Sequence, residues 1–473
     1  MLSAITDHLR AEAVDFCGSG RLPGYLAGVY HAGSQVVVGE GVANLATGAP
    51  MTEDTGFLIG SITKVLTATL LMRCVERGQV DLEARVTKYL PQLKLLEPAK
   101  VDELRVRHLV NHTNGIDGDF FFPDGGCGRD ALRHYLVELG AHCGTLFDPG
   151  ELVSYSNAGV LVMGRLLEAV TGECYHDLLD REIYRPVGMV DSVTSAEQAI
   201  LRRTAVGHFF DPAAGTFRRT EMFRLPETWS ACGSTPIATI ADLLAFARMH
   251  LADGVATTGE RVLSSELTRR MRTLTADLGT PNVASMGLGW PMIPFGPTSV
   301  LAHGGASPGG AADLVVVPEH DFAFAAFGNA GTASMLSDRL TQWLFREHLG
   351  MEVPDLVSST IEVADLGRYE GTYRSNQLRV DVRVVDGQLE ETMTYEPLNE
   401  RQARTFLQFS GGQFPTPPWR LDPVGDGLFA LAGAPLATFN GLGRIRMVSF
   451  HGSANGRASH RSFGGRMTRR QTD

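Results

Sequence analysis

Phe57-Leu58-Ile59-Gly60-Ser61-Ile62-Thr63-Lys64 is the stretch that decides the fold. A short apolar run ends at Gly60, and a helical pattern of apolar residues then continues from Ser61 to Val75. Ser61 and Lys64 stand three residues apart, about one helical turn, so their side chains share a face. A serine hydroxyl is a weak nucleophile until a base takes its proton, and an uncharged lysine is such a base. Burial beside an apolar helix favours that uncharged form.

The beginning of this helix adds a third chemical group. Its first N–H groups point at any negative charge that develops near Ser61, so one turn can supply a nucleophile, a base and part of an oxyanion site. Taken alone, the Ser-x-x-Lys pattern is weak evidence for a catalytic pair, because it more often marks an N-capping serine followed by a solvated lysine. The rest of the chain decides between the two.

Composition limits the classes of partner. The chain has 473 residues, 44% hydrophobic and 20% charged, with a net charge of −11. Such a chain forms a large core and has room for a second domain. The acidic balance argues against a nucleic acid or an anionic membrane as a partner. The basic cluster from Arg457 to Arg470 is interleaved with glycine and serine and is interpreted as strand and tail surface.

The N-terminal residues 1–25 lack the apolar centre of a signal peptide, and no later run reaches membrane-spanning length. We therefore expect the protein to begin at Met1 and to stay in the cytoplasm. The six cysteines show no CxxC spacing, so reduced, packed thiols are expected. His108 and His112 lack a third ligand at a useful spacing, so we expect helix capping and packing there. No metal or cofactor is expected.

Periodicity indicates two domains, over residues 1–354 and 367–473, with a linker over 355–366. In the first domain, helical spacing predicts a helix over 1–20 and another over 235–252, opened by Thr239. After Gly367 every element is expected to be a short strand. Alternating Leu378 to Val384 and the turn Asp386-Gly387 predict an antiparallel β-domain there, folded as a small barrel.

Two further motifs follow Ser61-Ile62-Thr63-Lys64 along the chain. Tyr155-Ser156-Asn157 stands where a loop meets an apolar helix over 160–170, and His303-Gly304-Gly305 ends a strand. Taken alone, these motifs indicate a buried tyrosine, an asparagine N-cap and a packed histidine at a strand end.

In this order, and with Pro149-Gly150-Glu151 and Gly287-Leu288-Gly289-Trp290, the motifs resemble the serine β-lactamase and penicillin-binding-protein superfamily. The resemblance is strongest to the branch of class C β-lactamases, D-aminopeptidases, D-alanyl-D-alanine carboxypeptidases and family VIII esterases, over roughly residues 10–350. It implies an α/β (α+β) fold, in which helices flank an antiparallel sheet and one subregion is all helical. The C-terminal β-barrel resembles the lipocalin-like domain appended to many such proteins.

The resemblance implies a role for each motif residue. Ser61 would be the acylated nucleophile, and Lys64 and Tyr155 would share the general-base and general-acid work. Asn157 would hold the substrate amide and help to fix Lys64. His303 would flank the cleft within reach of Tyr155 and the substrate.

The strand after His303 would complete the site. The backbone N–H groups of Ser61 and Ala306 would form the oxyanion hole. Gly304 and Gly305 would let the substrate backbone lie close to that strand. β-Lactamases of this fold usually carry Lys-Thr-Gly at this place, and a neutral histidine binds a β-lactam carboxylate less well, so efficient β-lactam hydrolysis is not expected.

The expected function is that of a serine hydrolase or acyltransferase acting on a peptide, ester or thioester. Two substrates are favoured: a peptide with D-residues, as for a D-aminopeptidase, and a carrier-bound peptide that is released and cyclised, as by a penicillin-binding-protein-type thioesterase. The alternatives are a carboxylesterase, a weak β-lactamase and a non-catalytic scaffold of the same fold. The expected partner is a small-molecule or peptide substrate, free or carried by a protein, and the number of subunits stays open.

Overall fold

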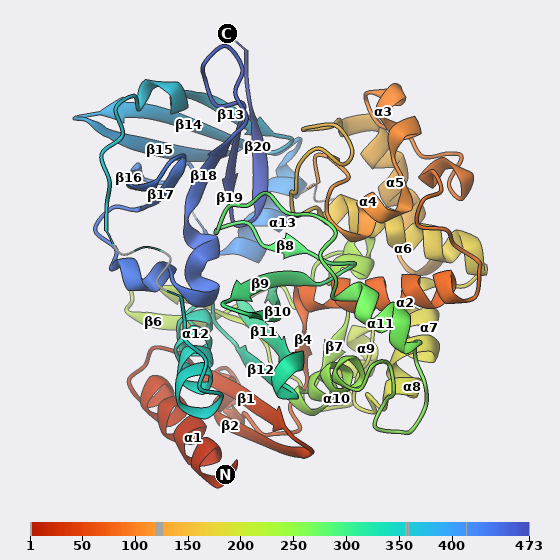
Figure 1. Cartoon of the computed structure of the whole chain (residues 1–473). Helices are drawn as coiled ribbons and strands as arrows, with labels where there is room; N and C mark the ends of the chain where they lie inside the picture. The colour runs from red at the N-terminus through yellow and green to blue at the C-terminus, as the bar shows by residue number, and fades with distance from the viewer. Residues whose placement is uncertain (1, 119–125, 355–356, 358, 413, 473) are drawn as a thin grey trace.

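The computed structural model describes residues 2–118, 126–354, 357, 359–412 and 414–472. They form a part built of a sheet and helices, followed by a barrel, and Figure 1 shows the barrel packed above the sheet and beside the helices. Three residues of the expected linker, 355, 356 and 358, lie outside the described part of the chain. No described helix is both long enough and apolar enough to cross a lipid bilayer.

An antiparallel sheet organises the first part, with eight strands among the described residues. Strand β1 pairs with β12 from Tyr25 to His31, so the start and the end of this part lie side by side. In sheet order β3-β2-β1-β12-β11-β10-β9-β8, the strands span Ala49–Pro50, Ser34–Asn44, Gly24–His31, Phe322–Gly328, Gly310–Val317, Thr298–Ser307, Pro291–Phe295 and Ser285–Met286.

The alternation of residues along β12 explains how helices cover both faces of the sheet. Phe322 and Phe324 point to one face, while Ala323 and Ala325 point to the other. The phenylalanine face packs against α1 and α12, and the alanine face packs against α10. The small alanines let α10 lie close to the sheet, so the sheet is buried on both sides.

Helix α2 lies at the centre of the helical region beside this sheet. Its residues from Thr63 to Cys74 are all buried, and among them Lys64 and Arg73 are buried charged side chains. The helices of this part are α1 (Leu2–Gly18), α2 (Thr63–Glu76), α3 (Pro98–Glu103), α4 (Val106–Val110), α5 (Ala131–His142), α6 (Asn157–Thr171), α7 (Tyr175–Leu179), α8 (Arg185–Val187), α9 (Ala196–Ala199), α10 (Ile240–Leu251), α11 (Ser265–Met271) and α12 (Ala333–Trp343).

Two short strand pairs accompany the helices, and one of them corrects a prediction. They are β4 (Phe57–Leu58) with β7 (Ile237–Ala238), and β5 (His208–Asp211) with β6 (Thr216–Arg219). The helix predicted over 235–252 begins at Ile240, and Thr239 opens it as predicted, because its side chain accepts a hydrogen bond from the Asp242 N–H; residues 235–238 are not helical. The preceding residues pair with the strand that leads to Ser61.

Strands of the second part close into a barrel, as the sequence predicts. The eight strands among the described residues are β13 (Gly371–Ser375), β14 (Leu378–Val385), β15 (Gln388–Tyr395), β16 (Trp419–Gly425), β17 (Leu428–Leu431), β18 (Val448–His451), β19 (His460–Phe463) and β20 (Arg466–Arg470). Tyr373, Val380 and Val382 lie in its core beside Phe429 and Phe450.

Helix α13 (Glu400–Ser410) interrupts the barrel strands, so the prediction of strands alone after Gly367 is wrong. Asn399 caps this helix by accepting a hydrogen bond from the Gln402 N–H. Phe406 and Phe409 on the helix pack against the core of the first part rather than inside the barrel. A helix-forming amphipathic segment is therefore held by the neighbouring part, where it lies between the two in Figure 1.

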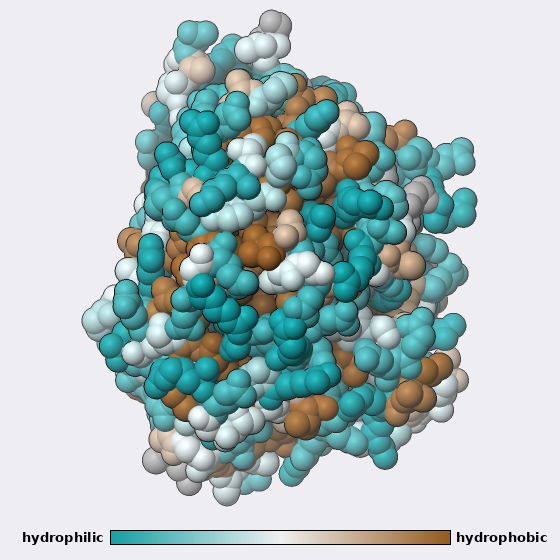
Figure 2. Space-filling model, turned by 90° about the vertical axis from the view of Figure 1, so that its right-hand side faces the viewer, coloured by the Kyte–Doolittle hydropathy of each residue, from teal (hydrophilic) through white to brown (hydrophobic). Residues whose placement is uncertain are grey.

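The surface of the molecule is largely hydrophilic on the side turned to the viewer in Figure 2. Apolar residues gather in patches toward the middle of that face. Single exposed apolar side chains there need no special explanation.

Candidate active site

Ser61 and Lys64 lie together at the start of the central helix. A 3-10 turn, Gly60–Ile62, leads into α2 and places both side chains on one face. Lys64 Nζ lies 2.8 Å from Ser61 Oγ and donates to Cys232 O at 2.7 Å. Lys64 is only 2% exposed, and no carboxylate of the described residues forms an ion pair with it. A buried amine that contacts a hydroxyl without a counter-ion suits a base.

The turn at Gly60 and strand β10 lie in close contact because the glycines at the contact have no side chains. A Cβ on Gly60 would lie 2.6 Å from Ala306 N, and a Cβ on Gly305 would lie 2.1 Å from Ile59 O. Gly60 also has a φ of +52°, which favours glycine. The backbones that carry the Ser61 and Ala306 N–H groups are thus brought side by side, as an oxyanion hole requires. Gly305 has a packing role that sequence reasoning missed.

Tyr155 lies over the amine from a different segment. Lys64 Nζ is 4.8 Å from the centre of its ring, and the ring stacks on His112 with centres 4.9 Å apart. The ring of His303 lies 6.1 Å from it. On the barrel side, the Arg466 guanidinium carbon lies 4.6 Å from the ring centre. The phenol therefore sits among one amine, one guanidinium and two imidazoles.

Both imidazoles are neutral at physiological pH. Burial, with the Lys64 charge adding to it, lowers the pKa of His303 to about 3, and the same causes lower the pKa of His112 to about 3. His303 Nδ1 lies 2.7 Å from Gly304 O, and because a carbonyl only accepts, Nδ1 carries the proton. Nε2 is then an acceptor, and it has no hydrogen-bond partner among the described residues.

Asn157 is the first residue of α6, which begins earlier than the sequence predicts. The N-cap of α6 is Ser156, whose Oγ accepts a hydrogen bond from the Gly159 N–H, so the interpretation of Asn157 as the cap is wrong. A second hydrogen bond fixes the backbone of Ser156, whose N–H donates to His112 Nδ1 at 3.1 Å. The helix start thus holds Asn157 in the wall of the same cavity as Ser61.

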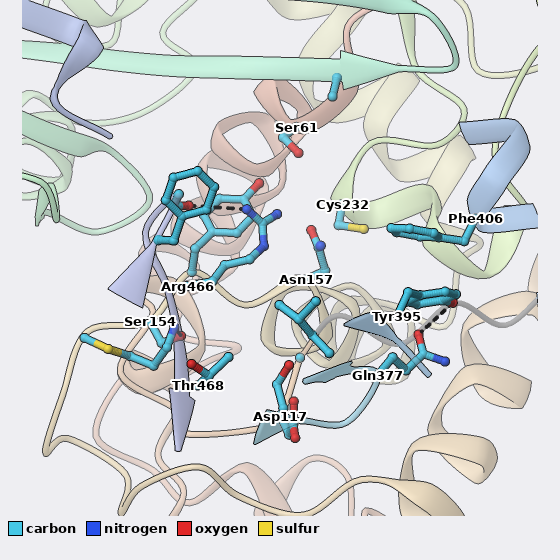
Figure 3. Close-up of a pocket in the computed structure, with 18 of the residues that line it drawn as sticks. Ser61, Asp117, Ser154, Asn157, Cys232, Gln377, Tyr395, Phe406, Arg466 and Thr468 are labelled. Carbon is cyan, nitrogen blue, oxygen red and sulfur yellow. Dashed lines mark hydrogen bonds between the residues drawn. The ribbon is translucent and has the colours of Figure 1, made fainter. Parts of the chain in front are cut away.

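Two adjoining cavities meet at Ser61 and Tyr155. The first, of about 370 Å³, is lined by Asn157 and is called here the Asn157 cavity. The second, of about 410 Å³, is lined by His303 and is called the His303 cavity. Figure 3 shows the Asn157 cavity with Ser61 and Asn157 on one side and Tyr395 and Phe406 of the barrel part on the other. The barrel part therefore forms a wall of the site.

The hairpin between β19 and β20 contacts the loop that carries Tyr155 and contributes Arg466 to the site. Gly465 O accepts a hydrogen bond from the Tyr155 N–H at 2.8 Å, and the Met467 N–H donates to Ser154 Oγ at 3.0 Å. Arg466 lines both cavities. The interpretation of this basic cluster as strand and tail surface is wrong for Arg461, which is 1% exposed and pairs with buried Glu391, whereas Arg466 is exposed on its strand as expected.

Several site residues have no motif in the sequence. The packing expected of His112 is present, but the sequence does not indicate that its ring partner is Tyr155. Arg466 and Tyr395 lie far along the chain from Ser61, and only the folded barrel brings them to it. The His-x-x-x-His spacing and the Gly464-Gly465 pair can be recognised in the sequence, but neither pattern indicates which residues it contacts in the folded protein.

Comparisons with known proteins agree with the motifs. Residues 3–346 match the family model described as Beta-lactamase. Penicillin-binding protein 4 of Amycolatopsis lactamdurans is 32% identical over 357 residues, which cover 74% of this chain and 93% of that protein. Two solved structures share the fold. SurE has a TM-score of 0.77 at 23% identity, with 100% of each chain covered. The D-amino acid amidase from Ochrobactrum anthropi SV3 has a TM-score of 0.61 at 23% identity, with 72% of this chain and 99% of that chain covered.

Proposed function

The chain belongs to the beta-lactamase family of serine hydrolases and acyltransferases, and on that premise we propose that it transfers the acyl group of a D-residue-containing peptide through an ester on Ser61. The acceptor is water or the amine of the same peptide. The observation that carries the proposal is the contact of Lys64 Nζ with Ser61 Oγ beneath the Tyr155 ring.

In the first half of the reaction, Ser61 Oγ attacks the carbonyl carbon while the Lys64 amine takes its proton. The carbonyl oxygen becomes an oxyanion held by the N–H groups of Ser61 and Ala306. When the bond to the leaving group breaks, Tyr155 returns a proton to the leaving atom. His303 Nε2 is an acceptor toward this side of the site, so it can orient the phenol or an incoming amine.

In the second half, water or an amine attacks the ester carbonyl, and the same groups work in reverse. Tyr155 takes the proton of the nucleophile, and Lys64 returns one to Ser61 Oγ as the ester breaks. The Arg466 guanidinium beside the ring favours the negative charge that develops on the phenol oxygen. No step requires a cofactor.

A peptide substrate is supported by the shape and chemistry of the site. Strand β10 pairs with β9 only as far as Leu301, so its edge from His303 to Ala306 faces the cavities rather than another described strand. A peptide can add along such an edge. The similar proteins named above include a penicillin-binding protein and, among the folds, a D-amino acid amidase in complex with D-phenylalanine.

Release and cyclisation of a carrier-bound peptide is the finer form of this proposal. The barrel wall encloses the acyl side of Ser61 with apolar side chains of Met393, Phe406 and Phe409. Such a wall limits the water that reaches an ester on Ser61 and leaves the amine of a folded-back peptide as the competing nucleophile. A thioester of a carrier protein would supply the acyl group.

Labelling followed by a substrate panel tests this function. Intact mass spectrometry after treatment with a fluorophosphonate should show one added probe on the wild type and none on Ser61→Ala. Peptidyl thioester mimics ending in D-Phe or L-Phe, the corresponding anilides, p-nitrophenyl esters and nitrocefin are then compared. Faster turnover of the D-Phe thioester, with a cyclic product, supports the proposal. Equal labelling of both proteins contradicts it, and preference for simple esters indicates a carboxylesterase.

A further inference from the structure

Arg444 is a buried cation without a counter-ion in the His303 cavity. It lies in the 3-10 segment Gly441–Arg446 of the barrel part, is 4% exposed and lines the cavity together with Ser61 and His303. Its Nε donates to Gly441 O at 2.8 Å, whereas Nη2 is buried without a partner. Among the described residues no carboxylate lies within ion-pair distance of the guanidinium. Burial alone lowers the pKa of Arg444 to about 10.

This isolation is unusual for the region. The neighbouring Arg446 is paired with Asp338, and Arg461 is paired with Glu391. A guanidinium does not lose its proton at physiological pH, so burial without an anion is costly to the folded protein. The Phe295 ring, 5.5 Å from the guanidinium carbon, fixes its position but supplies no full negative charge. An anionic ligand would supply the missing charge.

A second polar side chain in the same cavity also has an atom without a hydrogen-bond partner among the described residues. Asn282 is 1% exposed, and its Nδ2 donates to Met447 O at 3.3 Å, which leaves Oδ1 buried without a partner among the described residues. Asp313 also lines this cavity, and so does Asp338, which is paired with Arg446. Beyond these carboxylates and the catalytic groups, the cavity offers the Arg444 cation and the Asn282 acceptor. Asn157 lines the other cavity, which the proposed function gives to the acyl chain, so the His303 cavity is left to the leaving group.

We propose that the His303 cavity is a leaving-group subsite in which Arg444 binds an anionic end of the departing part of the substrate, and Asn282 Oδ1 accepts an N–H from it. The anion is the carboxylate of a C-terminal residue or the phosphate of a carrier arm, because a guanidinium binds either through its parallel N–H groups. This inference rests on the proposed acyl transfer at Ser61.

Four substrates with one common acyl peptide test the subsite. Their leaving groups form two matched pairs: D-alanine with D-alaninamide, and 4′-phosphopantetheine with pantetheine. In the wild type we expect kcat/KM to be at least tenfold higher for the anionic member of one pair. Arg444→Met should abolish that preference while changing the rate with the neutral member less than threefold. Preference within the first pair identifies a peptide carboxylate, and preference within the second identifies a carrier arm.

Arg383→Gln is the control for lost charge, because Arg383 is exposed on the outside of the barrel. It should leave both ratios unchanged. Thermal melts give a readout that does not depend on turnover. Arg444→Met should melt at a temperature equal to or above that of the wild type, since it removes an uncompensated buried charge. D-Alanine or free 4′-phosphopantetheine at millimolar concentration should raise the melting temperature of the wild type by several degrees and not that of the variant.

The outcomes separate the two proposals. If both proteins turn over all four substrates without an anionic preference, or if Arg444→Met melts far below the wild type, Arg444 is structural and the subsite is refuted. If no substrate reacts and Ser61 takes no fluorophosphonate, the proposed function fails instead, and the shift of melting temperature by the two free ligands still decides the subsite.

Discussion

The backbone N–H of Tyr155 donates a hydrogen bond to the carbonyl of Gly465, 2.8 Å away, so the phenol of the first part is held by the barrel. Ser154 next to it accepts from the Met467 N–H. The loop that carries Tyr155 is therefore a short additional partner of the β19–β20 hairpin. The position of one catalytic group depends on a segment that the catalytic motifs do not contain.

Lys64→Met should reduce the rate of fluorophosphonate labelling at Ser61 by about a thousandfold, because the side chain keeps its length and loses the base. Circular dichroism should show an unchanged fold. Lys88→Met, which alters an exposed lysine, should label like the wild type. Retention of most of the rate in Lys64→Met would mean that another group takes the serine proton.

Gly305→Ala should lower acylation by roughly a hundredfold, since its Cβ would meet Ile59 O at 2.1 Å and push the oxyanion-hole backbones apart. Gly304→Ala is the matched control, because its nearest neighbour, Asp313 Oδ1, would lie at 3.7 Å, an ordinary contact. Labelling rates of the two purified variants provide the comparison. Equal losses of labelling rate in the two variants would show that the packing of Gly305 does not control the geometry of the oxyanion hole.

Arg466→Ala should lower kcat for acyl transfer by about tenfold or more, because it removes the cation from the face of the Tyr155 ring. The effect should fall mainly on the step that moves the proton to or from the phenol, and so on kcat more than on the melting temperature. Arg469→Ala changes an exposed arginine on the same strand and should be silent. Loss of stability with unaltered kcat would place Arg466 among structural residues.

The protein should lose stability as the pH falls from about 6.5 toward 3. The pKa values of His112, His250 and His303 are each lowered by burial to about 3 in the folded chain, whereas unfolded histidine has a pKa of about 6.5. Between these values the unfolded chain binds more protons, and each histidine contributes a slope of about 1.4 kcal/mol per pH unit. Urea unfolding of the wild type and His250→Gln measures this slope, which should be shallower in the variant. Identical slopes would show that His250 does not titrate between the two states.

Truncation after residue 354 should leave a folded first part, because the sheet and helices have cores of their own. It should label poorly and melt at a lower temperature, since Tyr155 loses the Gly465 contact and the apolar Leu146 and Phe147 lose Met467. Gel filtration, thermal melts and fluorophosphonate labelling would show both effects. An insoluble fragment would mean that the barrel belongs to the same folding unit.

The sequence was sufficient for the barrel, because the alternation of apolar residues survives in the order of residues, and for the Ser61, Tyr155 and His303 motifs, whose order carries the resemblance that implies the sheet. It was insufficient where an element packs against residues that are far away in the sequence. Helix α13 was missed because its aromatic face packs on the core of the first part, which is far from it in the sequence, as well as on Tyr395 of the barrel. Arg461 looked like a surface residue because charge carries no record of the partner that covers it. Arg466 is exposed as expected, but only the folded barrel brings it to the Tyr155 ring.

The wall that the C-terminal strands and α13 build around the Asn157 cavity is a continuous stretch of chain, while the nucleophile, base and oxyanion backbones come from elsewhere. The C-terminal part therefore shapes the space for the acyl chain and also holds Tyr155 through Gly465 and Arg466. A chimera that receives the corresponding part of another member should inherit the donor's choice of acyl chain and keep its proton transfers where the donor supplies the same two contacts to Tyr155. Recombination at the junction offers such proteins a short route to new products.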